Sequence, residues 1–243
     1  MKLLLDVGNT SLRWVELRDG RLGEVRAVRH FGGVPIDLHA DWDDLDPPDQ
    51  IILASVAGED LTASVARVCQ SRWGLTPMSV RVSDGVFGVT VAYEDPSRLG
   101  VDRWLALIGA HADFPGDTLI LDAGTAVTFD RLRADGRHLG GLILPGRELM
   151  RDSLSRGTRI PRGAPTTGAP GPWATDTGAA IDNGIRLAPA ALAIYLLRAF
   201  ADEIGPAPQL LVTGGDAETL LPLLPATARW VPDLVFRGIR RLA

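Results

Sequence analysis

The sequence predicts an α/β protein built from two similar halves, and three observations support this prediction. Strand-like apolar runs alternate with segments of helical periodicity along the chain. The pattern restarts after Pro115-Gly116. Two segments of the same form, LLLDVGNTSLRW at 3–14 and LILDAGTAVTFD at 119–130, open the halves, and their aspartates Asp6 and Asp122 lie 116 residues apart. We therefore expect one domain at 1–115 and a second at 116–243.

The first half reads as a strand, a tight turn and a second strand, followed by alternating elements. DQIILASVAG is a nearly all-apolar run, typical of a strand covered on both faces. Leu61, Val65 and Val68 recur about one helical turn apart, and Gly74 ends that helix. The predicted strands are 2–7, 11–17, a run around 23–30, 49–58 and 78–84, and the predicted helices are 59–74 and one beginning near 96.

The second half repeats the strand, turn and strand at 118–132. A strand or loop at 140–146 then leads into a helix, and a long helix is predicted from about 181 to 203. The strand QLLVTGG, a short helix and a final strand and helix complete the chain, whose Arg-rich end FRGIRRLA we interpret as a solvated helix face. The Gly-, Pro- and Thr-rich segment 157–178 is either a lid over a substrate or a mobile insertion.

Composition narrows the class of protein. The chain has 243 residues and a net charge of -5, which argues against a nucleic-acid partner because such proteins usually present a basic face. The single Cys69 cannot form an internal disulfide, so a reducing cytoplasm is expected. No targeting segment is visible, and the apolar run 187–197 is shorter than the roughly 20 residues that span a bilayer, so it predicts a core helix and no membrane association.

The turn after each opening strand has two interpretations. Asp, Gly and Asn are the residues that a simple β-hairpin requires. However, an aspartate at the end of a buried strand is costly unless a cation pairs with it, and Mg²⁺ carried by ATP is such a partner. Gly8 lets the backbone approach a ligand, and Thr10, Ser11 or Thr125 can donate hydrogen bonds to phosphoryl oxygens. A third segment, VTGGDA at 212–217, ends a strand with paired glycines where a nucleoside could lie.

These three segments, in this order, resemble the two phosphate segments and the adenosine segment of the superfamily of acetate and sugar kinases, Hsp70 and actin. The resemblance implies two duplicated ribonuclease-H-like domains of the actin-like ATPase superfamily. It also implies that ATP binds in a cleft between them.

The segment YEDPSRLGVDRW at 93–104, together with DVGNT, DAGTAVTFD and GGLILPG, resembles type III pantothenate kinase over nearly the whole chain. The resemblance implies ATP-dependent phosphorylation of pantothenate to 4′-phosphopantothenate, the first step toward coenzyme A, by a homodimer that uses Mg²⁺ and a monovalent cation, K⁺ or NH₄⁺. Carried over residue by residue, it implies an ATP-phosphate segment of Asp6, Val7, Gly8, Asn9, Thr10, Ser11, Leu12 and Arg13, with Asp6 oriented toward magnesium. It further implies pantothenate contacts from Tyr93, Gly100, Val101, Asp102, Arg103 and Thr177, with Asp102 as catalytic base, Asp122 as the potassium position and Thr125 as an ATP contact. At one point the chain departs from the family pattern, because Asp176 stands where an Asn commonly precedes the threonine.

The chemistry of these residues is coherent. Asp102 lies near the start of a predicted helix, where the helix dipole favours the carboxylate, and a carboxylate can accept the proton of a primary hydroxyl. Arg103 could pair with the carboxylate of pantothenate or with the transferring phosphoryl group. Asp122 could hold potassium or, alternatively, magnesium. All four histidines are expected to be surface or core residues.

Two other functions remain open from the sequence. One is a non-catalytic nucleotide-binding regulatory protein on the same fold, and the other is a kinase of another small alcohol. The retention of Asp6, Asp102, Arg103 and Asp122 argues against a binding module, which has no need of a base.

Overall fold

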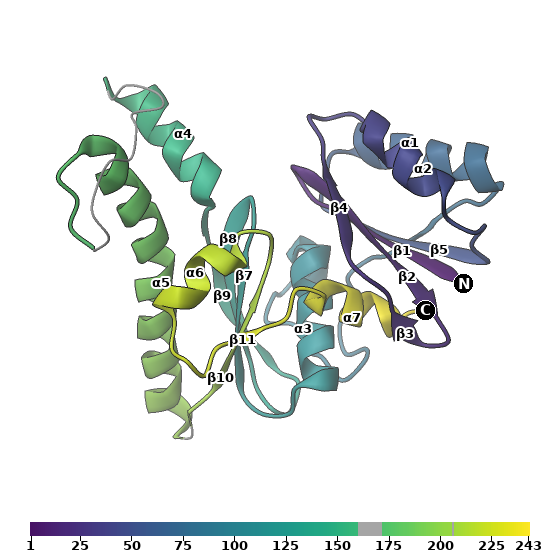
Figure 1. The fold of residues 1–243 in the computed structure, drawn as a ribbon. Helices are drawn as coiled ribbons and strands as arrows, with labels where there is room; N and C mark the ends of the chain where they lie inside the picture. Colours follow the sequence, from purple (N-terminus) through teal and green to yellow (C-terminus); the bar gives the residue numbers. More distant parts are fainter. Residues whose placement is uncertain (160–171, 206) are drawn as a thin grey trace. The chain divides into compact units, whose positions relative to one another are not determined.

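The computed structural model describes residues 1–159, 172–205 and 207–243, and the chain divides into two compact units (Figure 1). The N-terminal unit contains Met1–Pro115, Ala134–Gly140 and Asp233–Ala243, and the C-terminal unit contains Gly116–Arg133 and Gly141–Pro232. Each unit is described by itself.

The N-terminal unit is a sheet with helices on both faces. Its strands run in the order β3-β2-β1-β5-β6, and β4 pairs with β2. Its elements are β1 (Lys2–Val7), β2 (Ser11–Arg18), β3 (Arg21–Leu22), β4 (Arg26–Arg29), α1 (Ile36–Asp43), β5 (Gln50–Ser55), α2 (Glu59–Trp73), β6 (Met78–Ser79), the 3₁₀ turn η1 (Pro96–Arg98), α3 (Val101–Asp113) and α7 (Leu234–Arg240).

Alternation along β1 sends its side chains to two different layers. Leu3, Leu5 and Val7 pack in one core cluster with buried residues of α1 and α2. Asp6 therefore faces the opposite side of the sheet, where its cross-strand partner Arg13 lies against Phe236 of α7. This alternation brings a carboxylate from a buried strand to the face that α7 covers.

Helices α3 and α7 cross at glycines. A Cβ on Gly238 would lie 2.0 Å from the carbonyl oxygen of Leu105, and one on Gly109 would lie 2.4 Å from that of Leu234, so only glycine permits this approach. The expectation of a solvated helix face at the Arg-rich end is wrong, because Phe236 and its neighbours are buried. The arginines are held by ion pairs instead, since Arg237 and Arg240 contact Asp113 of α3 at 2.9 and 3.0 Å.

The C-terminal unit has a five-stranded sheet in the order β11-β10-β7-β8-β9. Its elements are β7 (Thr118–Ala123), β8 (Ala126–Leu132), β9 (His138–Pro145), whose first residues belong to the N-terminal unit, α4 (Arg147–Gly157), α5 (Thr177–Ile204), β10 (Gln209–Thr213), α6 (Ala217–Leu220), the 3₁₀ turn η2 (Leu221–Leu223) and β11 (Arg229–Trp230).

The two sheets repeat one topology. In each, the first strand forms an antiparallel hairpin with the second (β1–β2, β7–β8) and runs parallel to a third (β5, β10), which runs parallel to a fourth (β6, β11). Asp6 and Asp122 occupy the same place in this topology. The predicted α/β fold with duplicated halves is confirmed.

Several helices differ from the predictions at their ends. Helix α2 ends as predicted, with Gly74 in the left-handed region at φ 68°. The helix expected from residue 96 is a single 3₁₀ turn, and α3 begins only at Val101, because Leu99 and Gly100 are extended with ψ of 134° and 135°. Helix α1 was not predicted. The proposed lid segment 157–178 lies largely outside the described residues, since 160–171 are not among them.

Helix α5 is longer than its sequence pattern predicts. It has 28 residues and, in the part of the chain that the structure describes, it is long and apolar enough to cross a membrane by length and composition alone. Ala190 and Ala193 nevertheless lie in the core cluster beside β7 and β10. One side of α5 therefore packs in the core as predicted, while 28% of its most apolar window is buried.

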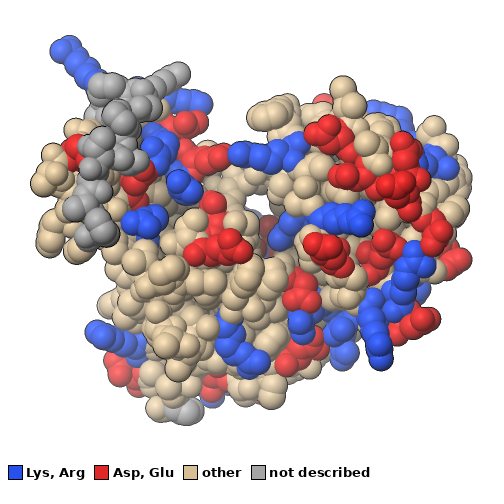
Figure 2. Space-filling view, in the orientation of Figure 1, with Lys and Arg blue, Asp and Glu red and all other residues tan. Residues whose placement is uncertain are grey.

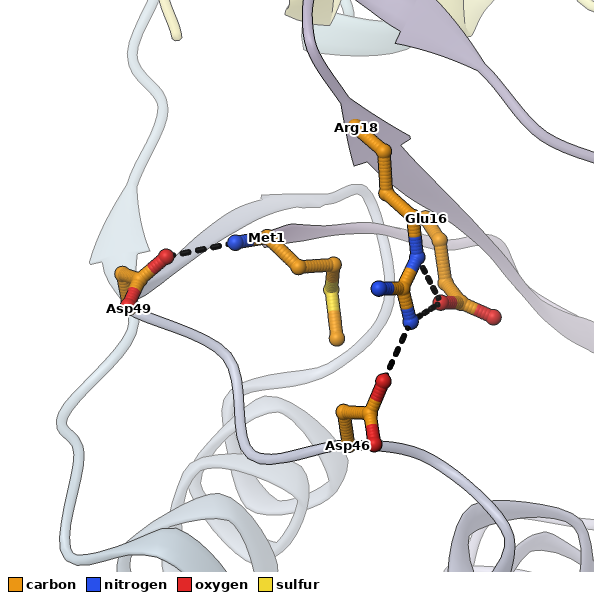
Figure 3. A network of polar contacts seen from close by, with 5 residues as sticks. All are labelled: Met1, Glu16, Arg18, Asp46 and Asp49. Atoms are coloured by element: carbon orange, nitrogen blue, oxygen red, sulfur yellow. Dashed lines mark hydrogen bonds and ion pairs between the residues drawn. The ribbon is translucent and has the colours of Figure 1, made fainter.

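Charged side chains of both signs are interspersed on the face of the molecule in Figure 2. At the end of the β1–β2 hairpin far from Asp6, Arg18 donates to Glu16 at 2.7 Å and to Asp46 at 2.8 Å, and the amino group of Met1 pairs with Asp49 (Figure 3). Solvent screens exposed pairs of this kind, so they add little to the stability of the fold. We assign this network to the surface of the hairpin.

Candidate active site

In the N-terminal unit, Asp6 is buried and paired with an arginine. Asp6 is 3% exposed, and Arg13 faces it across the β1–β2 hairpin. Both Nε, at 2.9 Å, and an Nη of Arg13 donate to Oδ2 of Asp6. The guanidinium also lies over the ring of Phe236, whose centre is 5.8 Å from Cζ. The Asp6 carboxylate is thus an anionic site that a protein cation occupies.

The tight turn between these strands has the form of a two-residue hairpin loop. Gly8 N–H donates to the carbonyl of Ser11 at 2.9 Å, which leaves Asn9 and Thr10 at the tip. Asn9 is exposed, whereas Val7 and Leu12 are buried in the core. The segment 6–13 therefore combines a buried anchor with an accessible tip, so the hairpin and phosphate-turn interpretations are compatible.

Asp102 is the second residue of α3. Its Oδ1 accepts a hydrogen bond from the backbone N–H of Arg103 at 2.8 Å, which fixes the carboxylate at the start of the helix. The position of this oxygen depends on Gly100, because a Cβ there would lie only 2.6 Å from it. The glycine at the N-cap of α3 thus leaves the space that the Asp102 carboxylate occupies.

The pKa of Asp102 is raised above its ordinary value. Burial is the largest cause, and the negative charge of Asp6 acts in the same direction. The hydrogen bond from Arg103 N–H and the charges of Arg103 and Arg13 lower the pKa but do not offset burial. The prediction that the helix dipole favours the ionised carboxylate is therefore wrong for the net shift, because the pKa of Asp102 is raised. A raised pKa makes the carboxylate a stronger base.

Arg103 and Tyr93 form a second polar pair beside Asp102. Nη1 of Arg103 donates to the hydroxyl of Tyr93 at 3.1 Å, and Cζ lies 5.9 Å from the centre of the ring. The ring of His138 stacks on the ring of Tyr93, with centroids 6.2 Å apart and planes at 11°. The structure therefore brings together Asp6, Arg13, Tyr93, Gly100, Asp102 and Arg103 within the N-terminal unit.

In the C-terminal unit, Asp122 and Thr125 lie at a second tight turn. Gly124 N–H donates to the carbonyl of Ala126 at 3.0 Å, and the carbonyl of Thr125 accepts from Gly146 N–H at 2.9 Å. Gly214, at φ 92°, lies against Asp122, because a Cβ there would come within 2.4 Å of Oδ1. The DAGT and GGD segments are thus in direct contact in this unit.

Thr213 is a candidate that the sequence argument missed. It pairs in register with Asp122 on the neighbouring parallel strand, so both side chains lie on the same face of the sheet. Its side chain is fully buried, and its Oγ1 has no hydrogen-bond partner among the described residues. A buried hydroxyl on the same sheet face as a carboxylate, at the carboxyl end of a parallel strand, makes Thr213 a candidate binding residue.

Thr177 is the first residue of α5 and is exposed. It lies about 50 residues after the turn at Asp122–Thr125 in the sequence. The preceding Asp176 caps the helix, with its Oδ1 accepting from Ala179 N–H at 2.8 Å. Asn and Asp cap helices about equally well. The departure from the family pattern at Asp176 therefore preserves the local structure.

The duplicated sheets, with an aspartate at the end of the first strand in each, define an α/β protein of the actin-like ATPase fold. Among solved structures, a Campylobacter jejuni protein assigned to the Baf family of transcriptional activators matches with a TM-score of 0.59 at 21% identity, covering 99% of this chain and 96% of that one. The activator of 2-hydroxyisocaproyl-CoA dehydratase from Clostridium difficile, with bound ADPNP, matches with a TM-score of 0.53 at 12% identity, covering 98% and 91%. These similarities show the fold.

Sequence comparison gives the family. The profile of type III pantothenate kinase matches residues 2–198. Type III pantothenate kinases from Nitrosococcus oceani and Thiobacillus denitrificans are 32% and 39% identical over the whole of this chain, covering 94% and 96% of their own length. The chain belongs to the type III pantothenate kinase family, and it is accordingly a kinase that acts on pantothenate with ATP in coenzyme A biosynthesis.

Proposed function

We propose that Asp102 is the general base of this reaction, the transfer of the γ-phosphoryl group of ATP to the primary hydroxyl of pantothenate. The carboxylate accepts the hydroxyl proton as the oxygen attacks phosphorus and the bond to the β,γ-bridging oxygen breaks, which yields 4′-phosphopantothenate and ADP. The observation that carries this proposal is the fixed position of Asp102, with its raised pKa, next to the charges of Asp6 and Arg13.

We assign the ATP phosphates to the segment from Asp6 to Arg13. The burial of Asp6 and its pairing with Arg13 support this assignment, because both features suit a carboxylate that faces a cation. Mg²⁺ bound to ATP supplies charge neutralisation and orients the phosphoryl oxygens. Asp6 would face this ion, and Arg13 would face the phosphates when they bind.

Asp122 is proposed to hold the monovalent cation, K⁺ or NH₄⁺, and Thr125 to contact ATP. Oxygen ligands suit K⁺, and the buried hydroxyl of Thr213 on the same sheet face fits such a group. The alternative is that Asp122 serves magnesium. Activity measured with Mg²⁺ fixed and K⁺ omitted separates the two.

Pantothenate contacts are assigned to Tyr93, Gly100, Val101, Asp102, Arg103 and Thr177. The bond between Arg103 and Tyr93 holds the guanidinium in place, so it is ready to bind an anion. That anion is either the carboxylate of pantothenate or the transferring phosphoryl group. An analogue of pantothenate without its carboxylate decides between them. If Arg103 binds the carboxylate, the analogue with the wild-type protein and pantothenate with Arg103→Lys should lose the same binding energy. If Arg103 binds the phosphoryl group, the two losses should differ.

A homodimer in the cytoplasm completes the proposal. The resemblance to a dimeric family supports the dimer, and Leu142, Ile143 and Tyr195 are exposed apolar residues of the C-terminal unit that a partner could cover. Light scattering after gel filtration is expected to give twice the mass of one chain. A monomer at micromolar concentration would remove this part of the proposal.

The test of the function is a coupled assay of ADP release with pantothenate, Mg²⁺ and K⁺. We expect turnover only when pantothenate is present, and a loss of about 10²–10⁴-fold in Asp102→Asn. ATP binding by calorimetry without pantothenate-dependent turnover would favour a regulatory nucleotide-binding protein instead. Greater turnover with another small alcohol would change the assigned substrate.

A further inference from the structure

His30 is a buried histidine that the proposed mechanism does not use. It follows β4 and is 5% exposed. Three of its polar groups have hydrogen-bond partners, two of them in the β1–β2 turn. The backbone N–H donates to the carbonyl of Thr10 at 3.0 Å, Nε2 lies 2.8 Å from the carbonyl oxygen of Gly8, and Nδ1 accepts from Gly32 N–H at 3.3 Å. His30 therefore contacts the 8–11 turn at two carbonyls.

These partners select one form of the imidazole ring. The carbonyl of Gly8 can only accept, so Nε2 must carry a hydrogen, and Gly32 N–H can only donate, so Nδ1 must be bare. We assign the neutral Nε2–H tautomer on these grounds. Both ring nitrogens are thereby used, and the ring has a fixed orientation.

The bond to Gly8 determines where the next amide points. A trans peptide is planar, so its C=O and N–H point in opposite directions. With the carbonyl of Gly8 held by His30, the N–H of Asn9 is directed away from His30. Two further carbonyls near the turn have partners, since Val7 accepts from Val56 N–H at 3.0 Å and Ser11 from Gly8 N–H at 2.9 Å.

This arrangement matters for an anion. A phosphate is attracted by N–H groups and repelled by carbonyl oxygens, so a peptide that rotates by half a turn changes a donor into a repulsive group. Asn9 is the exposed residue of the turn, and its backbone N–H is the group that His30 orients. His30 thus controls the polarity of the turn at its accessible tip.

We propose that His30 is a positioning residue for nucleotide binding, which holds the Gly8–Asn9 peptide with its N–H available to the phosphates of ATP. The inference rests on the assignment of residues 6–13 to the ATP phosphates. It assigns no contact between His30 and substrate, and it concerns the nucleotide and not pantothenate.

Two polar substitutions separate the ring nitrogens. The side-chain amide of His30→Gln is long enough to donate to the Gly8 carbonyl, as Nε2 does. The shorter side chain of His30→Asn replaces only Nδ1, the ring nitrogen closer to the backbone, and so it can keep only the hydrogen bond from Gly32 N–H. We expect H30N to raise the KM for ATP and the Kd for Mg-ADP about tenfold, as for one lost oriented hydrogen bond. The KM for pantothenate should stay within about twofold, and H30Q should bind nucleotide nearly as the wild type does. The control is His39→Gln, on the exposed side of α1.

Equal nucleotide affinity in H30N and the wild type overturns the inference, and so does an equal rise in both KM values. If H30N fails to fold, the wild-type chain gives the answer by ¹⁵N NMR. Mg-ADP is expected to shift the Asn9 amide and the Nε2–H of His30 together, and an Nε2–H signal that does not respond is the contrary result. Thr10→Val tests the underlying assignment separately. If it weakens Mg-ADP binding while H30N does not, only the role of His30 fails, and if neither does, the phosphate assignment fails.

Discussion

Replacement of Gly100 by alanine tests whether the position of the Asp102 carboxylate determines the rate. Gly100 is the N-cap of α3, with φ -58° and ψ 135°, a conformation that alanine adopts without strain. The added Cβ would lie 2.6 Å from Oδ1 of Asp102, whereas ordinary contacts begin at 3.4 Å. The oxygen therefore has to move by about 0.8 Å, or the side chain has to change rotamer.

A displacement of this size is large for catalysis. A misplacement of about 1 Å can cost roughly 10²-fold in rate, so we expect kcat of Gly100→Ala to fall by about 10- to 100-fold. The atom that moves is the end of a flexible side chain, so the melting temperature should change little. The KM for ATP should be unaffected, because Asp6 and Arg13 do not contact the new methyl group.

The matched control is Gly58→Ala. Gly58 is the N-cap of α2 in the same unit, with φ -58° and ψ 153°, and a Cβ there meets nothing within 4 Å. The coupled ADP assay and a thermal melt are run on both variants. If Gly100→Ala keeps kcat within twofold of Gly58→Ala, the reasoning from carboxylate position is refuted, and a rise confined to the KM for pantothenate would show that Gly100 acts only as a substrate contact.

Two further predictions concern buried polar groups. Because the folded-state pKa of Asp102 is raised, the stability it contributes is present at low pH and is lost as the pH rises through that pKa. Asp102→Asn, which does not titrate, should therefore melt at least as high as the wild type near neutral pH, with a difference that shrinks toward pH 3; a lower melting temperature at pH 7.5 contradicts this. Thr213→Val removes a buried hydroxyl without a partner among the described residues, so it should be more stable without K⁺, by about 1 kcal/mol, and should need several-fold more K⁺ for half-maximal activity. Unchanged dependence on K⁺ would remove Thr213 from the cation site, and Thr219→Val, whose hydroxyl is bonded to the carbonyl of Asp216, is the control.

Local patterns predict the parts of this fold whose causes are local. Alternation and turn residues locate the β1–β2 and β7–β8 hairpins, and Gly74 marks the end of α2. Helix α1 escapes prediction because only Leu38 and Trp42, one helical turn apart, are buried in it. The burial of α7 escapes it for another reason. Its arginines pair with Asp113, more than 100 residues earlier, and no local pattern reveals such a partner.

The same distinction between local patterns and tertiary contacts applies to the candidate site. Motif resemblance predicts Asp6, Asp102, Arg103 and Asp122 as site residues, because their spacing within each segment is set by strand, turn and helix. The sign of the pKa shift at Asp102 was beyond reach, since it depends on how deeply α3 is covered and on Asp6, 96 residues earlier. His30 and Thr213 were missed because each acts through a tertiary contact, with a turn in one case and a neighbouring strand in the other.

The duplication also explains why the monovalent cation is assigned to only one of the two aspartates. Asp6 faces Arg13 on the second strand of its hairpin and Ala54 on the parallel strand, while Asp122 faces Thr128 and Thr213 in the same places. The N-terminal unit thus carries its own cation opposite the carboxylate. In the C-terminal unit the equivalent positions carry neutral hydroxyls, which are oxygen ligands and supply no charge. The substitution Thr128→Arg tests this account. The new arginine should pair with Asp122 as Arg13 pairs with Asp6, and activity should become independent of K⁺ or be lost. Retained activation by K⁺ would show that Asp122 is not where the ion acts.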